Sequence, residues 1–394
     1  MEEIILIANP GSASRKYALY SGDKLLLSLH FEIEDGQVVF NFKTDNGQST
    51  ASHKAGISHL AFAANKVYGL AGQLGILSDK KQIKAIGLRV VAPSTYFQAD
   101  RLLNASTLDK LKDLEVLAPL HVNASLQEAH LLKQDFPTEK IVAVSDSAFH
   151  VNLPDVARYY GISTRDSEKL DIYRFGYHGL SVESVVGQLK EADKLPHRLI
   201  VCHLGSGSSV TAVKNGKSID CSMGFSPLEG LVMATRSGDI DTTAAEVIAK
   251  EKGLGRQQLQ DYLNNQSGLL GISGKSSDIR ELLKLEGQGD NKAALALDIY
   301  VYKIQQAIGK MAAGLGGIDG LVFTGTVGER SAAIRRRVIE KLLFLGLGLD
   351  PHLNHVHLQP AKLTKISASS HPVKIYIVPA SEDTVMLQHV RNAL

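Results

Sequence analysis

Two segments of the chain, 194 residues apart, carry the same pattern of strand, serine-rich loop, strand and tight turn. Residues 3–29 follow this pattern, and so do the residues that begin at Leu199. The matched residues are Gly11 and Gly205, Gly22 and Gly216, Ser12 and Ser206, and Ser14 and Ser208. A repeat of this length indicates two copies of a whole domain, because solenoid repeats are much shorter.

The length and composition agree with a duplicated globular protein. A chain of 394 residues is long enough for two or three domains. The net charge of +2 gives no electrostatic reason to expect nucleic acid or an acidic membrane as a partner. No apolar run reaches the ~20 residues of a membrane helix, and the N-terminus does not resemble a secretory signal. Cys202 and Cys221, predicted on neighbouring strands, are so few that a reducing, cytoplasmic location is expected.

Strands alternate with helices along the chain, which predicts an α/β fold with mixed sheets. In the first half we expect a strand at 84–91, helices at 102–117 and 119–132, and a strand at 140–144. In the second half we expect a helical region at 241–315, then a strand at 319–324 and a glycine loop at 325–328. A basic helix that contains Arg335, Arg336 and Arg337 should follow. The chain is then expected to form a strand at 374–378 and a terminal helix after Ser381.

Three glycine-containing loops follow predicted strands, at 9–14, 203–208 and 325–328. Backbone N–H groups in such loops can hold phosphate oxygens, and glycine permits close approach. None of the loops is a Walker A motif or a GxGxxG motif. Phosphate loops in both copies of a duplicated domain predict a nucleotide bound between the two domains.

Isolated charged residues stand beside strand ends or in short loops at Arg89, Asp146, His178, Arg236 and Glu382. Phosphoryl transfer needs cationic groups on the transferring oxygens, a Mg²⁺ ion between the phosphates and an aligned acceptor. Taken together, these residues meet that requirement. Taken one at a time, each also fits a structural role, such as a salt bridge, a core histidine or a helix cap.

The motifs of the chain resemble those of the acetate and propionate kinase family, in order and over nearly the full length. They are NPGSAS with Lys16, LRVV at 88–91, LAPLH at 117–121, DSAFH at 146–150, RFGYHG at 174–179, SMGFSPLEG at 222–230, TRSGDID at 235–241, SGLLGISGKSSDIR at 267–280, FTGTVGE at 323–329 and PASED at 379–383. TRSGDID and SGLLGISG are the most specific of them.

The resemblance implies an α/β fold of two duplicated ribonuclease H-like domains, as in actin, Hsp70 and sugar kinases, with an active-site cleft between them. The first domain is expected at 1–147, with the C-terminal helix 383–394 packing back onto it. The second is expected at 148–382 and carries the nucleotide loops. The family also implies a homodimer.

The implied activity is reversible, Mg²⁺- or Mn²⁺-dependent phosphoryl transfer from ATP to the carboxylate of acetate, which gives acetyl phosphate and ADP. By resemblance, the catalytic residues are Asp146, His178, Arg236 and Arg89. The carboxylate and its acyl chain would contact Arg89, Val91, Leu120, Tyr177 and Pro227. The nucleotide would contact Lys16, His203, Leu204, Gly205, Ser206, Gly207, Asp278, Ile279, Arg280, Thr326, Val327, Gly328, Glu329 and Arg330. Supporting residues are Ser12, Ser14 and His121, and the metal ligands are Asn9 and Glu382.

The chain departs from the family pattern at several of these positions. Ala92-Pro93-Ser94 stands where the family usually has His-Gly-Gly, and Ser206 stands for an asparagine. Thr326 and Arg330 replace a glycine and an asparagine, and Tyr177 replaces a phenylalanine. Three alternatives therefore stay open: a propionate or butyrate kinase, a kinase that uses pyrophosphate, and a nucleotide-binding homologue without catalysis.

Overall fold

The computed structural model describes residues 3–11, 14–34, 37–45, 49–55, 63–358 and 360–394. This part of the chain divides into two compact units. Unit 1 comprises residues 1–148 together with 382–394, and unit 2 comprises residues 149–381. Each unit is built on one sheet.

The sheet of unit 1 has the strand order β5-β4-β3-β2-β1-β6-β8-β7. β1 pairs antiparallel with β2 and parallel with β6, and β6 pairs parallel with β8. The strands are β1 (Ile4–Pro10), β2 (Ser14–Ser21), β3 (Lys24–Glu34), β4 (Gln37–Thr44), β5 (Ser49–Ala55), β6 (Ile83–Val90), β7 (Arg101–Leu102) and β8 (Lys140–Ser145).

The sheet of unit 2 has the strand order β11-β10-β9-β12-β14-β13. β9 pairs antiparallel with β10 and parallel with β12, which pairs parallel with β14. The strands are β9 (Arg198–Leu204), β10 (Ser208–Lys214), β11 (Lys217–Cys221), β12 (Gly320–Thr324), β13 (Thr364–Lys365) and β14 (Lys374–Ile377).

The two sheets share one topology, which confirms the predicted duplication. Five strands are arranged alike, as β3-β2-β1-β6-β8 in unit 1 and as β11-β10-β9-β12-β14 in unit 2. In both, the first three are antiparallel and the last two are added in parallel, and in unit 1 the antiparallel meander continues into β4 and β5. The first strands begin at Ile4 and Arg198 and the second strands at Ser14 and Ser208, so both pairs keep the offset seen in the sequence. The fold is therefore α/β with two duplicated domains.

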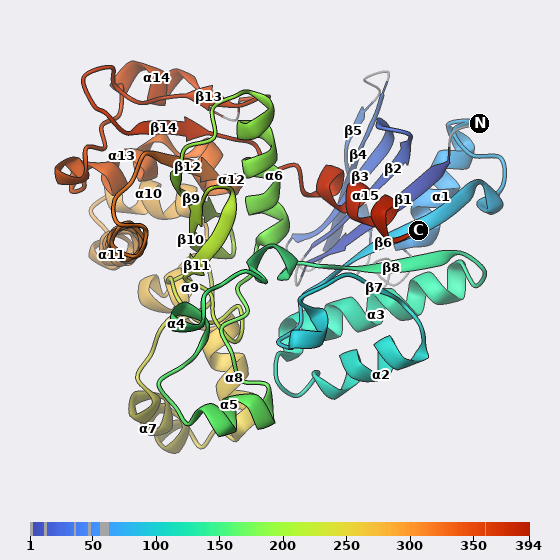
Figure 1. The fold of residues 1–394 in the computed structure, drawn as a ribbon, viewed down its shortest axis with the longest axis horizontal. Coiled ribbons are helices and arrows are strands. Elements are labelled where there is room, and N and C mark those ends of the chain that lie inside the picture. Colours follow the sequence, from blue (N-terminus) through green and yellow to red (C-terminus); the bar gives the residue numbers. More distant parts are fainter. Residues whose placement is uncertain (1–2, 12–13, 35–36, 46–48, 56–62, 359) are drawn as a thin grey trace. The chain divides into compact units, whose positions relative to one another are not determined.

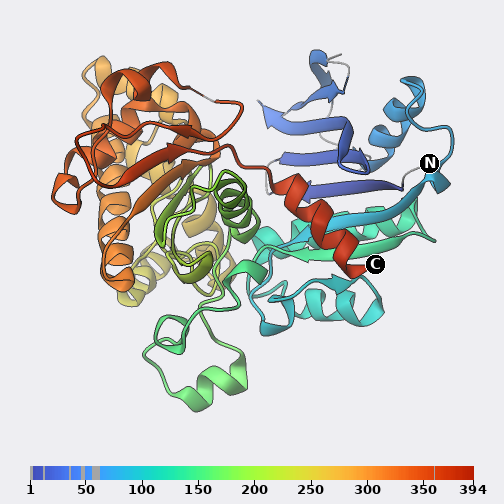
Figure 2. The same cartoon turned by 45° about the horizontal axis from the view of Figure 1, so that its top comes forward.

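Helices cover both faces of each sheet (Figures 1 and 2). In unit 1, α15 (Glu382–Ala393) packs on β1, β6 and β8, whereas α1 (Ala63–Gln73) and α3 (Pro119–Asp135) share a hydrophobic core with the opposite face. In unit 2, α6 (Gly179–Glu191) packs on one face, and the buried helix α11 (Asn291–Leu315) packs on the other with α13 (Ala332–Glu340). Helix α6, which comes after β8, α4 and α5 in the chain, thus covers the sheet of unit 2, whereas α15, which follows β14, covers the sheet of unit 1.

The part of the chain that the structure describes forms nine further helices of at most 11 residues each. They are α2 (Ala105–Asp113), α4 (Asp155–Arg158), α5 (Thr164–Leu170), α7 (Thr242–Lys252), α8 (Arg256–Asn265), α9 (Gly268–Ser273), α10 (Ile279–Gly287), α12 (Gly325–Arg330) and α14 (Pro351–Val356). Within the described ranges, no helix has both the length and the apolar character needed to cross a membrane.

Three local predictions are corrected. The glycine loop predicted at 325–328 is the first part of helix α12, which leaves β12 through Gly325 at φ 77°. The helix predicted at 102–117 is α2, and it starts later because Asn104 caps it, its side chain accepting a hydrogen bond from the Thr107 amide. Cys202 and Cys221 are buried free thiols on β9 and β11, and they are not on neighbouring strands, because β10 lies between them.

The turn between β10 and β11 forms as predicted from Asn215-Gly216. Both residues have positive φ, 52° and 77°. Two positive φ values in a two-residue loop are typical of a type I′ turn, whose twist matches that of the flanking strands. Only a residue without a β-carbon adopts the second position without strain.

We predict that Gly216→Ala destabilises the protein by about 1 kcal/mol, because alanine is strained at this φ. The added β-carbon would lie 3.5 Å from the nearest side-chain atom, so crowding adds little. The matched control is Gly187→Ala inside α6, where nothing lies within 4 Å of the added carbon. It should stabilise by up to about 1 kcal/mol. The measurement is the thermal unfolding midpoint of each variant. If Gly216→Ala and Gly187→Ala shifted this midpoint in the same direction, the backbone strain assigned to position 216 would be wrong.

Candidate functional site

In unit 1, polar side chains meet at the carboxyl ends of three neighbouring strands. Asn9 is near the end of β1, Arg89 near the end of β6, and Asp146 directly follows β8. Because these strands are parallel neighbours, their ends lie at one edge of the sheet. Arg89 donates from Nη1 to Asn9 Oδ1 at 3.1 Å and from Nη2 to Asp146 Oδ2 at 3.0 Å. These three predicted site residues therefore form one cluster.

Glu382, the first residue of α15, completes this cluster. Its carboxylate accepts a hydrogen bond from Asn9 Nδ2 at 2.8 Å and lies 3.7 Å from Arg89 Nη1. The position at a helix N-terminus favours a negative charge. The two predicted metal ligands, Asn9 and Glu382, thus lie in contact and offer amide and carboxylate oxygens, the donors that Mg²⁺ prefers. Among the described residues, no group of three histidine, cysteine or acidic side chains is arranged to hold a metal by itself.

The charges in this cluster are coupled. Burial opposes the charge of Arg89, but Asp146 and Glu382 outweigh it and raise the Arg89 pKa above its ordinary value. Asp146 is only 1% exposed. Burial and the charge of Glu382 raise the pKa of neighbouring Asp383 to about 6. The cluster therefore keeps a firmly charged guanidinium beside one buried and one partly buried carboxylate.

In unit 2, two predicted catalytic side chains converge on the loop after β9. A β-carbon at position 207 would lie 3.1 Å from His178 Nε2 and 3.3 Å from Arg236 Nη1. Glycine at this position therefore lets both side chains approach the loop backbone. Arg236 is 8% exposed, and its Nη1 donates to the Pro227 carbonyl at 3.3 Å. The predicted phosphate loop thus carries two cationic or proton-donating groups beside it.

The orientation of His178 is set by its neighbours. The residue precedes α6 at φ 60°, and its Nδ1 is hydrogen-bonded to Ser209 Oγ at 2.9 Å. Its ring stacks on His203, with centroids 4.1 Å apart and planes 26° from parallel. His203 Nδ1 is in turn bonded to Ser181 Oγ at 2.8 Å. These contacts leave Nε2 of His178 directed toward Gly207.

The other predicted nucleotide residues lie in unit 2, apart from Lys16, which is exposed on β2 of unit 1. Thr326 and Arg330 are exposed on α12, and Ser206 is exposed in the loop after β9. Asp278 caps α10 by accepting from the Arg280 amide at 2.7 Å. A side-chain hydrogen bond from Arg280 also lowers the Asp278 pKa. The remaining residues of this set are His203, Leu204, Gly205, Gly207, Ile279, Val327, Gly328 and Glu329.

The predicted acyl-pocket residues are divided between the units. Val91 is buried in unit 1, whereas Tyr177 and Pro227 are buried in unit 2. The Tyr177 hydroxyl donates to the Phe225 carbonyl at 2.7 Å, so this buried polar group is satisfied. Of the supporting residues, Ser14 begins β2 and Ser12 lies outside the described residues. Leu120 and His121 belong to α3, but their side chains also lie outside the described part.

One histidine that was not predicted as a site residue anchors the Tyr177 backbone. His150 is fully buried, with Nε2 3.1 Å from the Tyr177 carbonyl and Nδ1 2.8 Å from Ser218 Oγ. Because a carbonyl only accepts, Nε2 carries the proton and Nδ1 accepts from the serine. Burial lowers the His150 pKa to about 4, so the ring stays neutral at physiological pH. The sequence signal that could have identified this histidine is its position in the DSAFH motif, four residues after Asp146.

A second network also escaped prediction. Glu229 of the SMGFSPLEG motif pairs with Arg174 and accepts from the Tyr160 hydroxyl. Arg174 also donates to the Cys221 carbonyl at 2.6 Å. This network ties the motif that contains Pro227 to the RFGYHG motif that contains His178.

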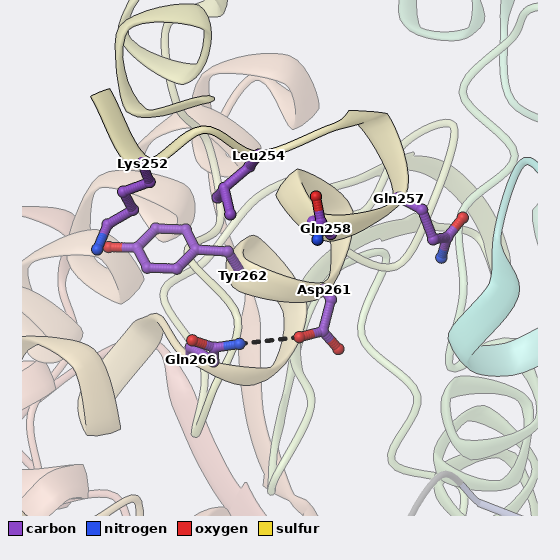
Figure 3. A pocket seen from close by; sticks show the side chains of 7 residues that line it. All are labelled: Lys252, Leu254, Gln257, Gln258, Asp261, Tyr262 and Gln266. Atoms are coloured by element: carbon purple, nitrogen blue, oxygen red, sulfur yellow. Dashed lines mark hydrogen bonds between the residues drawn. The ribbon is translucent and has the colours of Figure 1, made fainter. Parts of the chain in front are cut away.

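α7 and α8 form a separate pocket on unit 2 with a volume of about 690 Å³ (Figure 3). Its lining includes none of the predicted site residues. Tyr262 lies in the pocket beside Lys252, whose Nζ is 5.1 Å from the ring centroid, and Asp261 accepts from Gln266 at 2.9 Å.

We predict that His150 makes stability depend on pH in acid. Its folded-state pKa lies below its ordinary value, so the unfolded chain takes up the proton first. The contribution of His150 to the free energy of unfolding is therefore fully present above about pH 6.5. It is lost as the pH drops toward 4, and the total loss is about 3 kcal/mol. His150→Gln, which keeps the donor to the Tyr177 carbonyl, should flatten this part of the profile.

The measurement is the urea-unfolding midpoint of both proteins between pH 4 and 7.5. His355→Gln, a change of an exposed histidine on α14, controls for the loss of one imidazole. Parallel profiles for the wild type and His150→Gln would show that the assignment of the acid transition to His150 is wrong.

Comparison with known proteins identifies relatives of the whole chain. Residues 4–388 match the model of the acetokinase family. The acetate kinase of Helicobacter hepaticus is 36% identical over 394 residues, 98% of each chain. The crystal structure of Porphyromonas gingivalis acetate kinase superimposes with a TM-score of 0.84 at 30% identity, covering 99% of both chains. That of a propionate kinase from Francisella tularensis does so with a TM-score of 0.86 at 34% identity, covering 100% of both. The chain therefore belongs to the acetokinase family.

Proposed function

We propose that the protein is an acetate kinase, which transfers the γ-phosphoryl group of ATP reversibly to the carboxylate of acetate. The observation that carries this proposal is the convergence of His178 and Arg236 on Gly207 in the loop after β9. Family membership establishes the class of enzyme, a phosphotransferase with a carboxyl group as acceptor.

In unit 1, Arg89 binds the carboxylate of the substrate. A guanidinium can hold a carboxylate through two parallel hydrogen bonds. Asp146 and Asn9 already fix the orientation of this guanidinium at 3.0 and 3.1 Å. The substrate carboxylate is ionised at pH 7, so it attacks phosphorus without a strong base. Asp146 then acts as the catalytic carboxylate that keeps Arg89 aligned and charged.

Asn9 and Glu382 would hold the Mg²⁺ ion. When bound, the ion supplies charge neutralisation for the phosphates. The mutual contact of the two side chains at 2.8 Å supports a shared ligand role. Mg²⁺ usually keeps several waters and takes one or two protein carboxylates or other oxygens, which this pair provides.

In unit 2, Arg236 and His178 stabilise the charge on the transferring phosphoryl group. Both groups are held in place before the reaction, His178 by Ser209 and by stacking on His203, and Arg236 by burial. Donors that need no reorganisation at the moment of transfer contribute most to catalysis. Residues 203–207, 278–280 and 326–330, together with Lys16, bind the nucleotide.

Propionate is a second candidate acceptor, because a propionate kinase is among the similar structures. The Tyr177 hydroxyl donates to the Phe225 carbonyl, so within unit 2 this residue offers its ring carbon atoms to the acyl chain of the substrate. Pyrophosphate remains an alternative donor. A cytoplasmic homodimer is further proposed from family membership alone.

Acyl phosphate formation, trapped with hydroxylamine, tests the pair of substrates. We expect the highest kcat/KM with acetate and ATP among acetate, propionate and butyrate, each assayed with ATP and with pyrophosphate. If only another carboxylate or another donor supported turnover, the protein would still be a kinase of this family, but with that substrate in place of acetate or ATP. No acyl phosphate with any pair would contradict the proposed function.

Arg236→Ala should lower kcat by 10²-fold or more, about the loss expected for a donor to the transition state. The control is Arg256→Ala, which removes an exposed arginine of α8 and should leave kcat unchanged. Unchanged turnover of Arg236→Ala, with the fold intact by circular dichroism, would remove Arg236 from the reaction.

A further inference from the structure

Arg335 is a completely buried arginine in a run of three arginines on α13. Its exposed fraction is 0%, whereas Arg336 is exposed and Arg337 pairs with Glu286. Position 335 lies on the same helix face as Val338 and Ile339, which are buried in the core of unit 2. A buried charge is retained only where its hydrogen-bonding groups find partners.

All five N–H donors of Arg335 are used, and every acceptor is neutral. Nε donates to Asn354 Oδ1 at 2.7 Å. Nη1 donates to the Gly328 and Glu329 carbonyls, both at 2.8 Å. Nη2 donates to the Asn354 carbonyl at 2.8 Å and to the His357 carbonyl at 3.4 Å. Burial lowers the Arg335 pKa to about 10, so the group remains charged at neutral pH.

The acceptors are at the carboxyl ends of two short helices. Gly328 and Glu329 lie near the end of α12, and Asn354 and His357 lie at the end of α14. Carbonyl groups at a helix C-terminus have no partners within the helix and attract a cation. Arg335 therefore fixes the end of α12 to α14, which lies more than 20 residues further along the chain.

The start of α12 is held by a different contact. The Glu329 side chain accepts from the Gly325 amide at 3.0 Å and from the Ala380 amide at 3.3 Å. Between these two ends of α12, Thr326 and Arg330 are exposed and Gly328 is buried. The helix is thus secured at both ends while its predicted nucleotide-facing positions stay accessible.

We propose that Arg335 is a positioning residue for nucleotide binding, which holds α12 so that residues 326–330 contact the nucleotide. The inference rests on the proposed function, because it takes the nucleotide role of residues 326–330 from it. Only arginine suits the position: lysine offers three donors from one nitrogen and cannot reach acceptors on two helices with a planar fork.

The test compares Arg335→Lys with Arg336→Lys. Both variants keep the charge, and the second changes an exposed arginine of the same helix whose contact is the i,i+4 pair with Glu340. We expect Arg335→Lys to raise the KM for ATP and the Kd for ADP by about tenfold, as for the loss of one or two hydrogen bonds. The KM for acetate should change by less than about twofold, and Arg336→Lys should behave as the wild type.

The binding measurement separates this inference from the proposed function. ADP affinity is measured by calorimetry, and acyl phosphate formation is measured separately. A wild-type protein that neither binds ADP nor forms an acyl phosphate contradicts the proposed function itself. An active wild type whose ADP affinity is unchanged in Arg335→Lys overturns only the positioning role. Equal rises of both KM values would also overturn it, because they indicate a general loss of structure.

A second variant covers the case in which Arg335→Lys does not fold. Asn354→Ala removes the acceptor of Nε and leaves the bonds from Nη1 to α12 in place. We expect a smaller rise of the ADP Kd, about threefold, and a correspondingly smaller ADP-induced shift of the unfolding midpoint. An ADP Kd equal to that of the wild type would overturn the proposal.

Discussion

The ion pair between Arg89 and Asp146 joins the ends of two parallel strands in unit 1, and the cluster around it depends on this pair. Asn9 comes from β1 and Glu382 from α15, so four elements meet at one guanidinium. Burying such charges is costly, and a core of apolar residues is often at least as stable. Stability alone therefore does not account for the cluster, which agrees with the proposed role of Arg89 in binding a carboxylate. Removing Arg89 would take this ion pair away from the buried carboxylate of Asp146.

In unit 2, the partners of the two predicted catalytic side chains include neutral groups. His178 is oriented by a serine hydroxyl and by a stacked imidazole, and Arg236 donates to the Pro227 carbonyl. Such contacts fix the direction of each side chain. In unit 1, by contrast, Arg89 is held by carboxylates. The same duplicated topology thus supports two local environments, and the proposed function assigns the first to the carboxylate substrate with its metal and the second to the phosphate groups.

The sequence predicted features that depend on local signals, and missed those that depend on partners distant in the chain. The predicted 194-residue repeat and the predicted turn at Asn215-Gly216 are both confirmed. Both depend on turn residues, which determine the backbone φ angle locally. The glycine-rich stretch after β12 was wrongly interpreted as a loop, because a helix of six residues held by Glu329 and Arg335 leaves little local pattern. The cysteines were wrongly placed on neighbouring strands because strand order requires knowledge of the pairing. In the run of three arginines, only the contact with Asn354 distinguishes the buried one.

The departures from the family pattern differ in their physical consequences. Ala92-Pro93-Ser94 is buried, and Ser94 caps a short helical turn by accepting from the Tyr96 amide, so this stretch is part of the local fold. The Tyr177 hydroxyl is satisfied by a backbone carbonyl and adds no unpaired polar group. Thr326 and Arg330, by contrast, are exposed on α12. Ser206, the third departure among the predicted nucleotide residues, is exposed in the loop after β9. A phosphoryl donor different from that of the relatives would therefore be explained at these three exposed positions, two of them on the helix that Arg335 holds in place.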